Sequence, residues 1–259
     1  HRGIHISFVV GLVFIFYSWK KIDHSKKNFN TPLIDIILSI LVVISALYLP
    51  LLPPEVLAPR VGNPENIDII MGSFLIVLTL EAARRSIGFT LPFICVLFIL
   101  FAIFGPYFPG ALKHGGASWV GFVNHIYLTN QGIYGIAVGV MAQYVFLFIL
   151  FGVLATRIGL GQLFIDLAMV IAGKYSGGPA KVAIFSSAFL GTISGSSIAN
   201  TVTTGSLTIP AMKKVGYPPH FSGAVEATAS TGGQITPPIL GAAAFIMVEY
   251  LEVPLRDIL

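Results

Sequence analysis

Long apolar stretches dominate this sequence, and short polar segments separate them. The clearest runs are Ile4–Tyr17, Leu33–Leu52, Ile87–Phe104 and Ile133–Ala155. Each approaches or exceeds the roughly 20 residues that a helix needs to cross a bilayer. Lipid offers no hydrogen bonds, so the backbone must satisfy its own polar groups, which favours helices over an open sheet. The pattern therefore predicts an all-α polytopic membrane protein.

Basic residues at the ends of these runs orient the predicted helices. The first crossing, near Ile4–Trp19, is followed by a loop with Lys20, Lys21, Lys26 and Lys27, and such lysine-rich loops are cytoplasmic. Residues 1–109 are thus predicted to form a multi-helix scaffold. Its other expected crossings are Leu33–Leu52 outward, Ile67–Leu80 inward to Arg84 and Arg85, and Ile87–Phe108 outward.

The pattern changes after Pro109. Residues 110–131 mix aromatic, apolar and polar side chains, and Trp119–Thr129 fits a short helix that lies in the membrane interface. We expect this segment to be an interfacial connector. Ile133–Ala155 is the next predicted crossing, and its Gly135 and Gly139 form a G-x-x-x-G spacing that permits close helix contact.

A re-entrant hairpin is predicted from the positions of basic residues in the second half. If all of them are cytoplasmic, Gln162–Ala172 is an interfacial arm, and Val182–Met212 must enter and leave the membrane on the same side. Two arms of about 15 residues reach roughly 22 Å at 1.5 Å per residue. The tip would lie at Ser194–Asn200. The basic residues are Arg157, Lys174, Lys181, Lys213 and Lys214.

The predicted tip is rich in small polar residues. Irregular backbone at membrane depth is tolerated where it is buried in protein or lines a cavity. Hydroxyl and carbonyl oxygens there would suit a hard monovalent cation, while helix N-termini can face an anionic solute. The alternative is that these small residues only pack helices together. The candidate ion- or substrate-binding residues are Ser194, Gly195, Ser196, Ser197 and Asn200.

A second polar break interrupts the predicted helix at residues 221–250. Proline cannot donate a backbone hydrogen bond, and it pushes the preceding Thr236 out of helical geometry. We expect an unwound segment with free carbonyls between Phe221–Ala229 and Ile239–Tyr250, as in broken transporter helices. A simple kinked helix is the alternative. The candidate residues in this break are Gly232, Gly233, Gln234, Pro237 and Pro238.

The absence of titratable residues indicates the coupling ion. No Asp, Glu, His, Lys or Arg occurs between Val182 and Met212 or between Gly232 and Val248. Proton-coupled carriers use titratable groups within the membrane, so neutral oxygens favour Na⁺. Glu226 and Glu249 flank the second break. Both fit interfacial or packing positions, and Glu226 is also a candidate gating or proton-linked group.

Composition supports the membrane class and excludes others. The 259 residues are 55% hydrophobic and 10% charged, against about a quarter charged in soluble domains. The net charge of +4 comes from residues that flank apolar runs, so no nucleic-acid partner is predicted. The single cysteine, Cys95, predicts no disulfide and reads as a packing residue. No metal-binding or hydrolase motif is present, so no enzyme is predicted.

From Gly191 to Glu249 the chain resembles the large membrane subunit of TRAP transporters, the tripartite ATP-independent periplasmic carriers. The resemblance is strong after about Gly132 and weaker before it. A departure at His220-Phe221-Ser222 lies outside the matching motifs. These motifs are Gly177-Gly-Pro-Ala-Lys181, Ser194-Gly-Ser-Ser-Ile-Ala-Asn200, Ile209-Pro-Ala-Met212, Gly216-Tyr217 and Ala224–Gly233 through Pro237-Pro238.

The resemblance implies an elevator-type permease of the bacterial inner membrane, driven by Na⁺ and needing no other cofactor. It would import organic-acid-type solutes delivered by an extracytoplasmic binding protein. Residues 1–109 would correspond to the small subunit, fused as in the TAXI type, and residues 132–259 to the start of the transport region. The second inverted repeat is missing, so we expect a fragment truncated at both ends. The implied Na⁺ ligands are Ser194, Ser197, Asn200 and Gly232.

Three other functions remain as alternatives. A non-transporting membrane scaffold would use the polar breaks only to pack against partners. A proton-coupled carrier would need a titratable group such as Glu226. An intramembrane serine hydrolase would need a base beside the tip serines, and no histidine is near them in the sequence.

Overall fold

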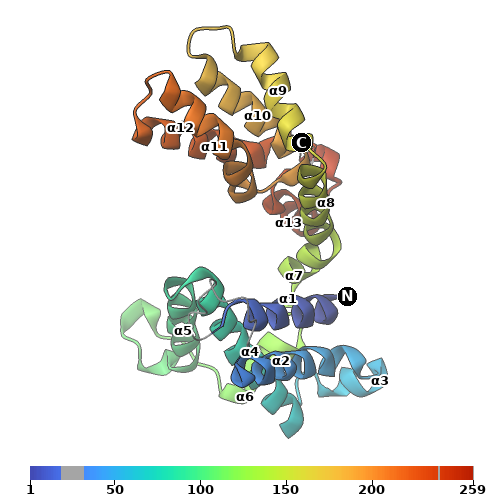
Figure 1. The fold of residues 1–259 in the computed structure, drawn as a ribbon. Helices are drawn as coiled ribbons and strands as arrows, with labels where there is room; N and C mark the ends of the chain where they lie inside the picture. The colour runs from blue at the N-terminus through green and yellow to red at the C-terminus, as the bar shows by residue number, and fades with distance from the viewer. Residues whose placement is uncertain (19–31, 239, 259) are drawn as a thin grey trace. The chain divides into compact units, whose positions relative to one another are not determined.

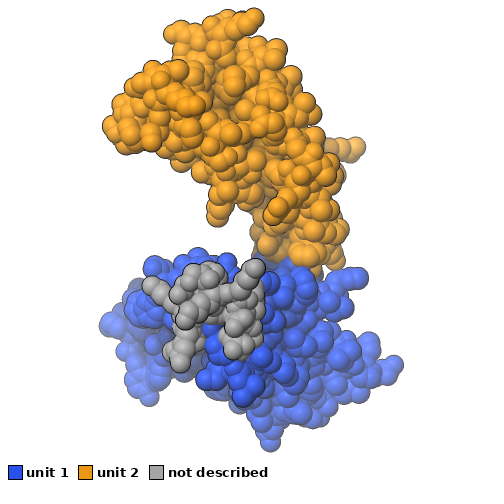
Figure 2. All heavy atoms as spheres, in the orientation of Figure 1, with its two compact units in different colours: residues 1–139 blue, residues 140–259 orange. Residues whose placement is uncertain are grey.

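The computed structural model describes residues 1–18, 32–238 and 240–258, which form helices and turns and contain no β-strand. Two compact units are present, residues 1–139 and 140–259 (Figures 1 and 2). The all-helical prediction is therefore confirmed for this part of the chain. Trp19, the end of the first predicted crossing, and the lysine-rich loop that follows it lie outside the described residues.

Three packed helices form the base of the first unit. They are α1 (Arg2–Phe16), α2 (Leu33–Leu51) and α4 (Asn66–Ile87); α2 packs against both of the others (Figure 1). A capping box starts α4, in which the Asp68 carboxylate accepts the Glu65 N–H at 2.9 Å. Gly88 follows α4 with φ +100°, a conformation that glycine adopts without strain.

Shorter elements complete the first unit and its core. These include the helices α3 (Pro54–Leu57), α5 (Thr90–Ile103) and α6 (Trp119–Val123). A π-helical turn, Asn124–Leu128, directly follows α6. Two tyrosines fasten this turn region to α2, because Tyr127 Oη donates to Ser45 O at 2.6 Å and Tyr134 Oη to Ala46 O at 2.9 Å. The main buried core comprises Ile6, Ala46, Leu49, Leu75, Ile76, Val123, Tyr127, Leu128 and Tyr134.

Two of the predicted crossings have the length required for a membrane span, and two are shorter. α2 and α4, with 19 and 22 residues, are both long and apolar enough. α1 has 15 residues and α5 has 14, so α5 is only about 21 Å long against a hydrocarbon core of about 30 Å. The prediction of a full span at Ile87–Phe108 is therefore wrong in length. Gly88 and the turn at Gly105–Tyr107 bound the helix instead.

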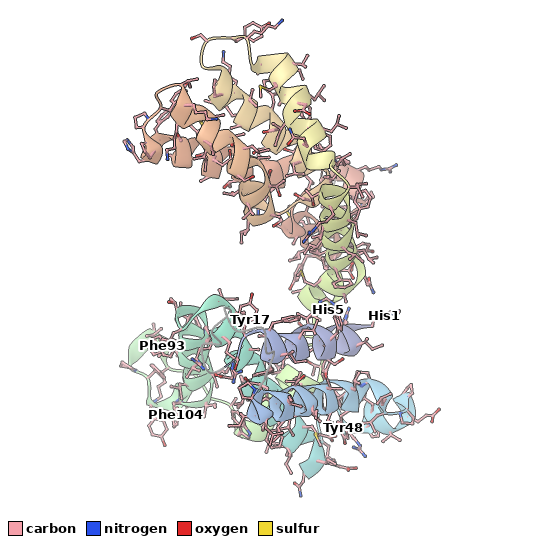
Figure 3. All side chains as sticks on the ribbon, in the orientation of Figure 1. His1, His5, Tyr17, Tyr48, Phe93 and Phe104 are labelled. Carbon is pink, nitrogen blue, oxygen red and sulfur yellow. The ribbon has the colours of Figure 1, made fainter. Side chains whose placement is uncertain are left out.

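The surface of α5 is apolar. Phe93, near its start, and Phe104, just past its end, are exposed (Figure 3). Cys95 is also exposed, so its predicted packing role within this chain is wrong. Exposed apolar side chains of this kind are expected on a helix that faces lipid.

The third helix long enough to cross a membrane is Ile136–Arg157. It consists of α7 (Ile136–Val140), a π-helical stretch (Met141–Val145) and α8 (Phe146–Arg157). Gly135 precedes this helix, so the predicted G-x-x-x-G face is not formed. A Cβ atom at Gly139 would instead lie 2.8 Å from Arg2 Nε.

The second unit contains a helical hairpin and an interrupted helix. α9 (Leu160–Ala172) packs against α10 (Gly178–Ser194), which forms the hairpin with α11 (Ser197–Lys214). α12 (Pro219–Gly232) packs against both hairpin arms, and α13 (Ala242–Leu251) follows the break (Figure 1). The bounds of α9, of α10 with α11, and of α12 and α13 fall within or close to the segments predicted as arm helix, hairpin and broken helix, and α12 and α13 are separate helices. Re-entry into a membrane stays a prediction.

Two buried aspartates link α2 to α4 in the first unit. Asp35, early in α2, accepts a bond from Arg85 Nη1 at 2.7 Å, and Arg85 lies in the last turn of α4. Asp68, early in α4, accepts from Tyr48 Oη at 2.9 Å and from Arg60 Nη1 at 3.2 Å. Both carboxylates are fully buried. Buried charges need such partners, so these contacts fix the two helices in one register.

Replacing Asp68 with alanine is expected to lower the free energy of unfolding by about 3 kcal/mol, because Arg60 and Tyr48 lose their buried partner. Glu65→Gln is the control. Glu65 is 58% exposed in its 3.0 Å pair with Arg60, so this change should cost below about 1 kcal/mol. Denaturant titration of the micelle-bound protein measures both. If both variants lowered the free energy of unfolding equally, Asp68 would not be the buried partner that stabilises Arg60 and Tyr48.

Candidate functional site

The hairpin turn is built from one glycine and one serine. Gly195 follows α10 in the left-handed region, with φ +56°, and its N–H donates to Gly191 O at 3.3 Å. The Ser196 side chain accepts the Ala199 N–H at 3.3 Å and so caps the start of α11. Glycine is the residue that adopts this backbone conformation without strain, which allows the chain to reverse within two residues.

The break after α12 is irregular, and three of its carbonyls accept hydrogen bonds. A 3₁₀ turn spans Gly233–Ile235, and α13 starts after Gly241. The Gly232 carbonyl accepts Thr236 Oγ1 at 3.1 Å, and the Gly233 carbonyl accepts the Thr236 N–H at 3.3 Å. The Gln234 carbonyl accepts the Gly241 N–H at 2.6 Å. The carbonyls of Gly232, Gly233 and Gln234 are therefore bonded and not free as predicted, although each oxygen keeps a second lone pair.

Glycines bring the hairpin and the break into backbone contact. A Cβ atom at Gly191 would lie 2.5 Å from Gly233 O, and one at Gly195 would lie 2.1 Å from Leu240 O. A Cβ atom at Gly233 would lie 2.5 Å from Asn200 Nδ2. No side chain fits at these positions without displacing its neighbours. The two segments that the sequence singled out therefore lie together at one place.

Side chains add to this contact. Gln234 Nε2 donates to Ser197 Oγ at 3.1 Å, which joins the break to the first turn of α11. Asn200 is 1% exposed, and its Nδ2 donates to Ser187 O at 2.8 Å on the opposite hairpin arm. Pro237 and Pro238 are exposed and end the helical path of the break.

Two buried oxygens at the tip have no hydrogen-bond partner among the described residues. They are Asn200 Oδ1 and Ser194 Oγ. Buried polar atoms in folded proteins are almost always satisfied by protein, water or an ion. Ser196 and Ser197 differ, because their hydroxyls already accept bonds from Ala199 and Gln234. The predicted tip residues with polar side chains therefore form two groups. Asn200 and Ser194 have open oxygens, whereas the hydroxyls of Ser196 and Ser197 are already bonded.

A cavity of about 220 Å³ adjoins the tip. Ser194, Gly195, Ser196 and Gln234 line one side, and apolar residues of the second unit line the other. Among these, the rings of Phe148 and Phe245 stack at 5.3 Å. Typical sites for drug-sized ligands measure about 300–1,000 Å³, so this space suits an ion or one small functional group.

A buried acidic cluster lies beside the hairpin, and sequence reasoning missed its extent. Glu226 on α12 is fully buried and accepts hydrogen bonds from Thr204 and Thr208 of α11. Ser230 Oγ also donates to Glu226 Oε1, at 3.0 Å. Of the positions predicted for Glu226, burial against α11 fits the packing one. Glu249, in contrast, is exposed.

The sequence did contain a signal for this cluster. Asn200, Thr204 and Thr208 recur every fourth residue on α11, and Glu226 and Ser230 do so on α12. Residues at this spacing share one helix face. Two polar faces on neighbouring helices therefore predict mutual contact. No group of three or more His, Cys, Asp or Glu residues occurs within the described ranges, which gives a multidentate transition-metal site no ligand set there.

Comparisons with known proteins identify the family. Residues 74–259 match the family described as "Tripartite ATP-independent periplasmic transporter, DctM component". A putative TRAP transporter large permease protein of Haemophilus influenzae is 37% identical over 109 residues, which is 40% of this chain and 26% of that protein. The C4-dicarboxylate TRAP transporter large permease protein DctM of Rhodobacter capsulatus is 33% identical over 103 residues, 40% of this chain and 22% of that protein.

A third relative is the isethionate TRAP transporter permease protein DctMQ of Oleidesulfovibrio alaskensis, 41% identical over 91 residues, 35% of this chain and 14% of that protein. These alignments thus span about a quarter or less of each relative. No solved structure gives a significant match. The family match begins at residue 74, inside the range predicted as small-subunit-like, and runs through the hairpin and the break. It covers well over half of the chain, and the protein therefore belongs to the DctM component family of TRAP transporters, the large membrane permeases of these carriers.

Proposed function

We propose that this chain is part of the permease of a Na⁺-driven TRAP transporter in a bacterial inner membrane. It takes small organic anions from an extracytoplasmic binding protein. Family membership supports a role in transport, and the three apolar helices of sufficient length support a multi-pass position. The fused TAXI type, the elevator movement and delivery by a binding protein come from the sequence resemblance.

The observation that carries the proposal is the pair of open oxygens at the hairpin tip. Asn200 Oδ1 and Ser194 Oγ are buried and unbonded within the described chain, where oxygen ligands suit a hard cation. Ser197 Oγ and the Gly232 carbonyl are the other proposed Na⁺ ligands, each with a lone pair left. In transporters with broken helices, the unwound backbone carbonyls and the C-terminal ends of the half-helices bind Na⁺ in this way.

The solute class follows from charge and from the relatives. α11 is 18 residues long, and the positive end of its helix dipole faces the tip cavity. The names of two relatives specify C4-dicarboxylate and isethionate, which are small organic anions. We therefore place the anionic group of the solute at the start of α11, beside Gly195 and Ser196.

Reconstitution tests this function directly. The intact transporter, placed in liposomes with its binding protein and C4-dicarboxylate as the first solute, should accumulate solute when an inward Na⁺ gradient is imposed. Accumulation should fall at least about tenfold when choline replaces Na⁺. Uptake that ignores the Na⁺ gradient would refute the coupling, and uptake without a binding protein would refute the tripartite assignment.

A proton-coupled carrier is the second candidate function. The buried carboxyl group of Glu226 favours it, because titratable groups inside a membrane protein often belong to proton pathways. In sodium-free liposomes an inward proton gradient would then drive uptake. Such uptake, together with its loss in Glu226→Gln, would replace Na⁺ by the proton as the coupling ion.

A further inference from the structure

We infer that Glu226 supplies the negative charge that balances the coupling cation at the hairpin tip. This inference rests on the proposed cation site. Glu226 is fully buried, and it forms no ion pair with any Lys, Arg or His among residues 1–18, 32–238 and 240–258. A buried carboxylate without a cationic partner is costly unless hydrogen bonds and a nearby positive charge stabilise it.

Hydroxyl groups hold the carboxylate from two helices. Thr204 and Thr208 of α11 and Ser230 of α12 contact its two oxygens. Hydrogen bonds to an ionised acceptor are the stronger kind. Gly205 permits this approach, because a Cβ atom there would lie 2.9 Å from Glu226 Cγ. The surroundings thus fix the position of the carboxylate and leave its charge without a counter-charge.

The same hydroxyls lead to the tip. Thr204 Oγ1 lies 2.9 Å from Asn200 O and 3.3 Å from Ser187 Oγ. Asn200 Nδ2 in turn donates to Ser187 O, so Ser187 links the acidic cluster to the side chain that carries the open oxygen. Thr204 follows Asn200 by four residues, which is about 6 Å along the helix. The Glu226 carboxylate, which contacts Thr204, therefore lies within about 10 Å of a cation bound at Asn200.

The other acidic residues are less suited than Glu226 to balance the charge of the cation. Both hairpin arms lack Asp and Glu, and Glu226 is the single acidic residue of α12. Glu249 lies on α13 and is exposed, so water screens its charge. Two unit charges about 10 Å apart at an effective dielectric constant of about 20 change an affinity by about tenfold. That is the contribution expected from Glu226.

Glu226→Gln removes the charge and nearly keeps the shape of the side chain, with an amide N–H donor in place of one carboxylate oxygen. The readout needs no solute: Na⁺ titrates the thermal stability of the intact purified transporter, with choline keeping the ionic strength constant. The Na⁺ concentration that raises the melting temperature by a fixed increment, here called the midpoint, should be about tenfold higher in Glu226→Gln than in the wild type. The control Glu249→Gln should leave it unchanged.

Other outcomes overturn the inference. If the wild-type protein responds to Na⁺ and Glu226→Gln has the same midpoint, this inference fails and the proposed function stands. The same holds if Glu226→Gln is less stable than the wild type but its midpoint is unmoved. A wild-type protein that does not respond to Na⁺ refutes the proposed function as well.

A second variant guards against misfolding of Glu226→Gln. Changing Glu226 to Met together with Thr204→Val and Thr208→Val removes the charge and its donors at once, and such apolar replacement is often well tolerated. It should show the same tenfold shift, and an unmoved midpoint in this folded variant would equally overturn the inference.

Discussion

Replacing Gly191 with alanine is expected to reduce Na⁺-driven uptake by the intact transporter to below about a tenth. The new methyl group would lie 2.5 Å from Gly233 O, 2.6 Å from its Cα and 2.9 Å from its carbonyl carbon. These are backbone atoms, so no change of rotamer relieves the overlap. Overpacking of this kind costs about 1–3 kcal/mol, and here it separates the hairpin from the break. Uptake into proteoliposomes at matched protein content measures the effect.

Gly223 on α12 provides the control. A Cβ atom at Gly223 meets no atom within 4 Å, so Gly223→Ala should retain uptake within about twofold. The pair also separates a carrier from a non-transporting scaffold. In a carrier, Gly191→Ala loses uptake and still assembles in the membrane. If Gly191→Ala instead fails to assemble in the membrane, the result would favour the scaffold.

Replacing Asn200 with alanine should raise the half-saturating Na⁺ concentration by on the order of 30-fold or more. The change removes the open Oδ1 and also the 2.8 Å bond from Nδ2 to Ser187 O. An interaction with a charged group contributes about 2 kcal/mol, and losing the Asn200 ligand therefore weakens cation binding by about 30-fold. The Na⁺ dependence of uptake, measured at fixed solute and binding protein, reports the change.

Ser206→Ala is the matched control for Asn200→Ala. Ser206 lies on the same helix and is exposed, and its hydroxyl bonds only to Thr203 O at 2.9 Å within the described chain. We expect its Na⁺ dependence to equal that of the wild type. If Asn200→Ala kept the wild-type Na⁺ dependence as well, the Asn200 oxygen would not be a cation ligand, and the proposed site would have to lie elsewhere.

The elements of the second unit could be predicted from the sequence because each has a local cause. Gly195 can adopt a left-handed conformation, and Pro237 with Pro238 cannot continue a helix. The basic residues at Lys181 and Lys213 bound the hairpin on both sides. These effects act within a few residues, so one sequence is enough to locate them.

The contents of the site depended on contacts between segments, which one sequence does not specify. Glu226 is about 20 residues away from Thr204 and Thr208, and only the packing of α12 on α11 brings their side chains together. Neither polar segment contains a titratable residue, which favoured Na⁺, although Glu226 lies against α11 in three dimensions. The carbonyls of Gly232 and Gly233 have a local partner instead, because Thr236 follows them by four and three residues.

Helix lengths in the first unit show a different limit. Apolar runs continue past the ends of α5, because Phe104 and Phe108 are as apolar as the residues within the helix. Hydropathy measures the environment of a residue and not its backbone conformation. Gly88 and Pro106 decide where the helix ends, and they weigh little in a hydropathy average.

The contact between Gly191 and Gly233 also limits how solute preference can change among related carriers. Main-chain atoms are the same in every residue, so substitution cannot tune the junction itself. Diversification is left to the walls of the neighbouring cavity, where Phe148 and Phe245 can be exchanged for side chains of other size or polarity. Exchange of these two side chains would thus alter the cavity beside the tip and leave the backbone junction as it is.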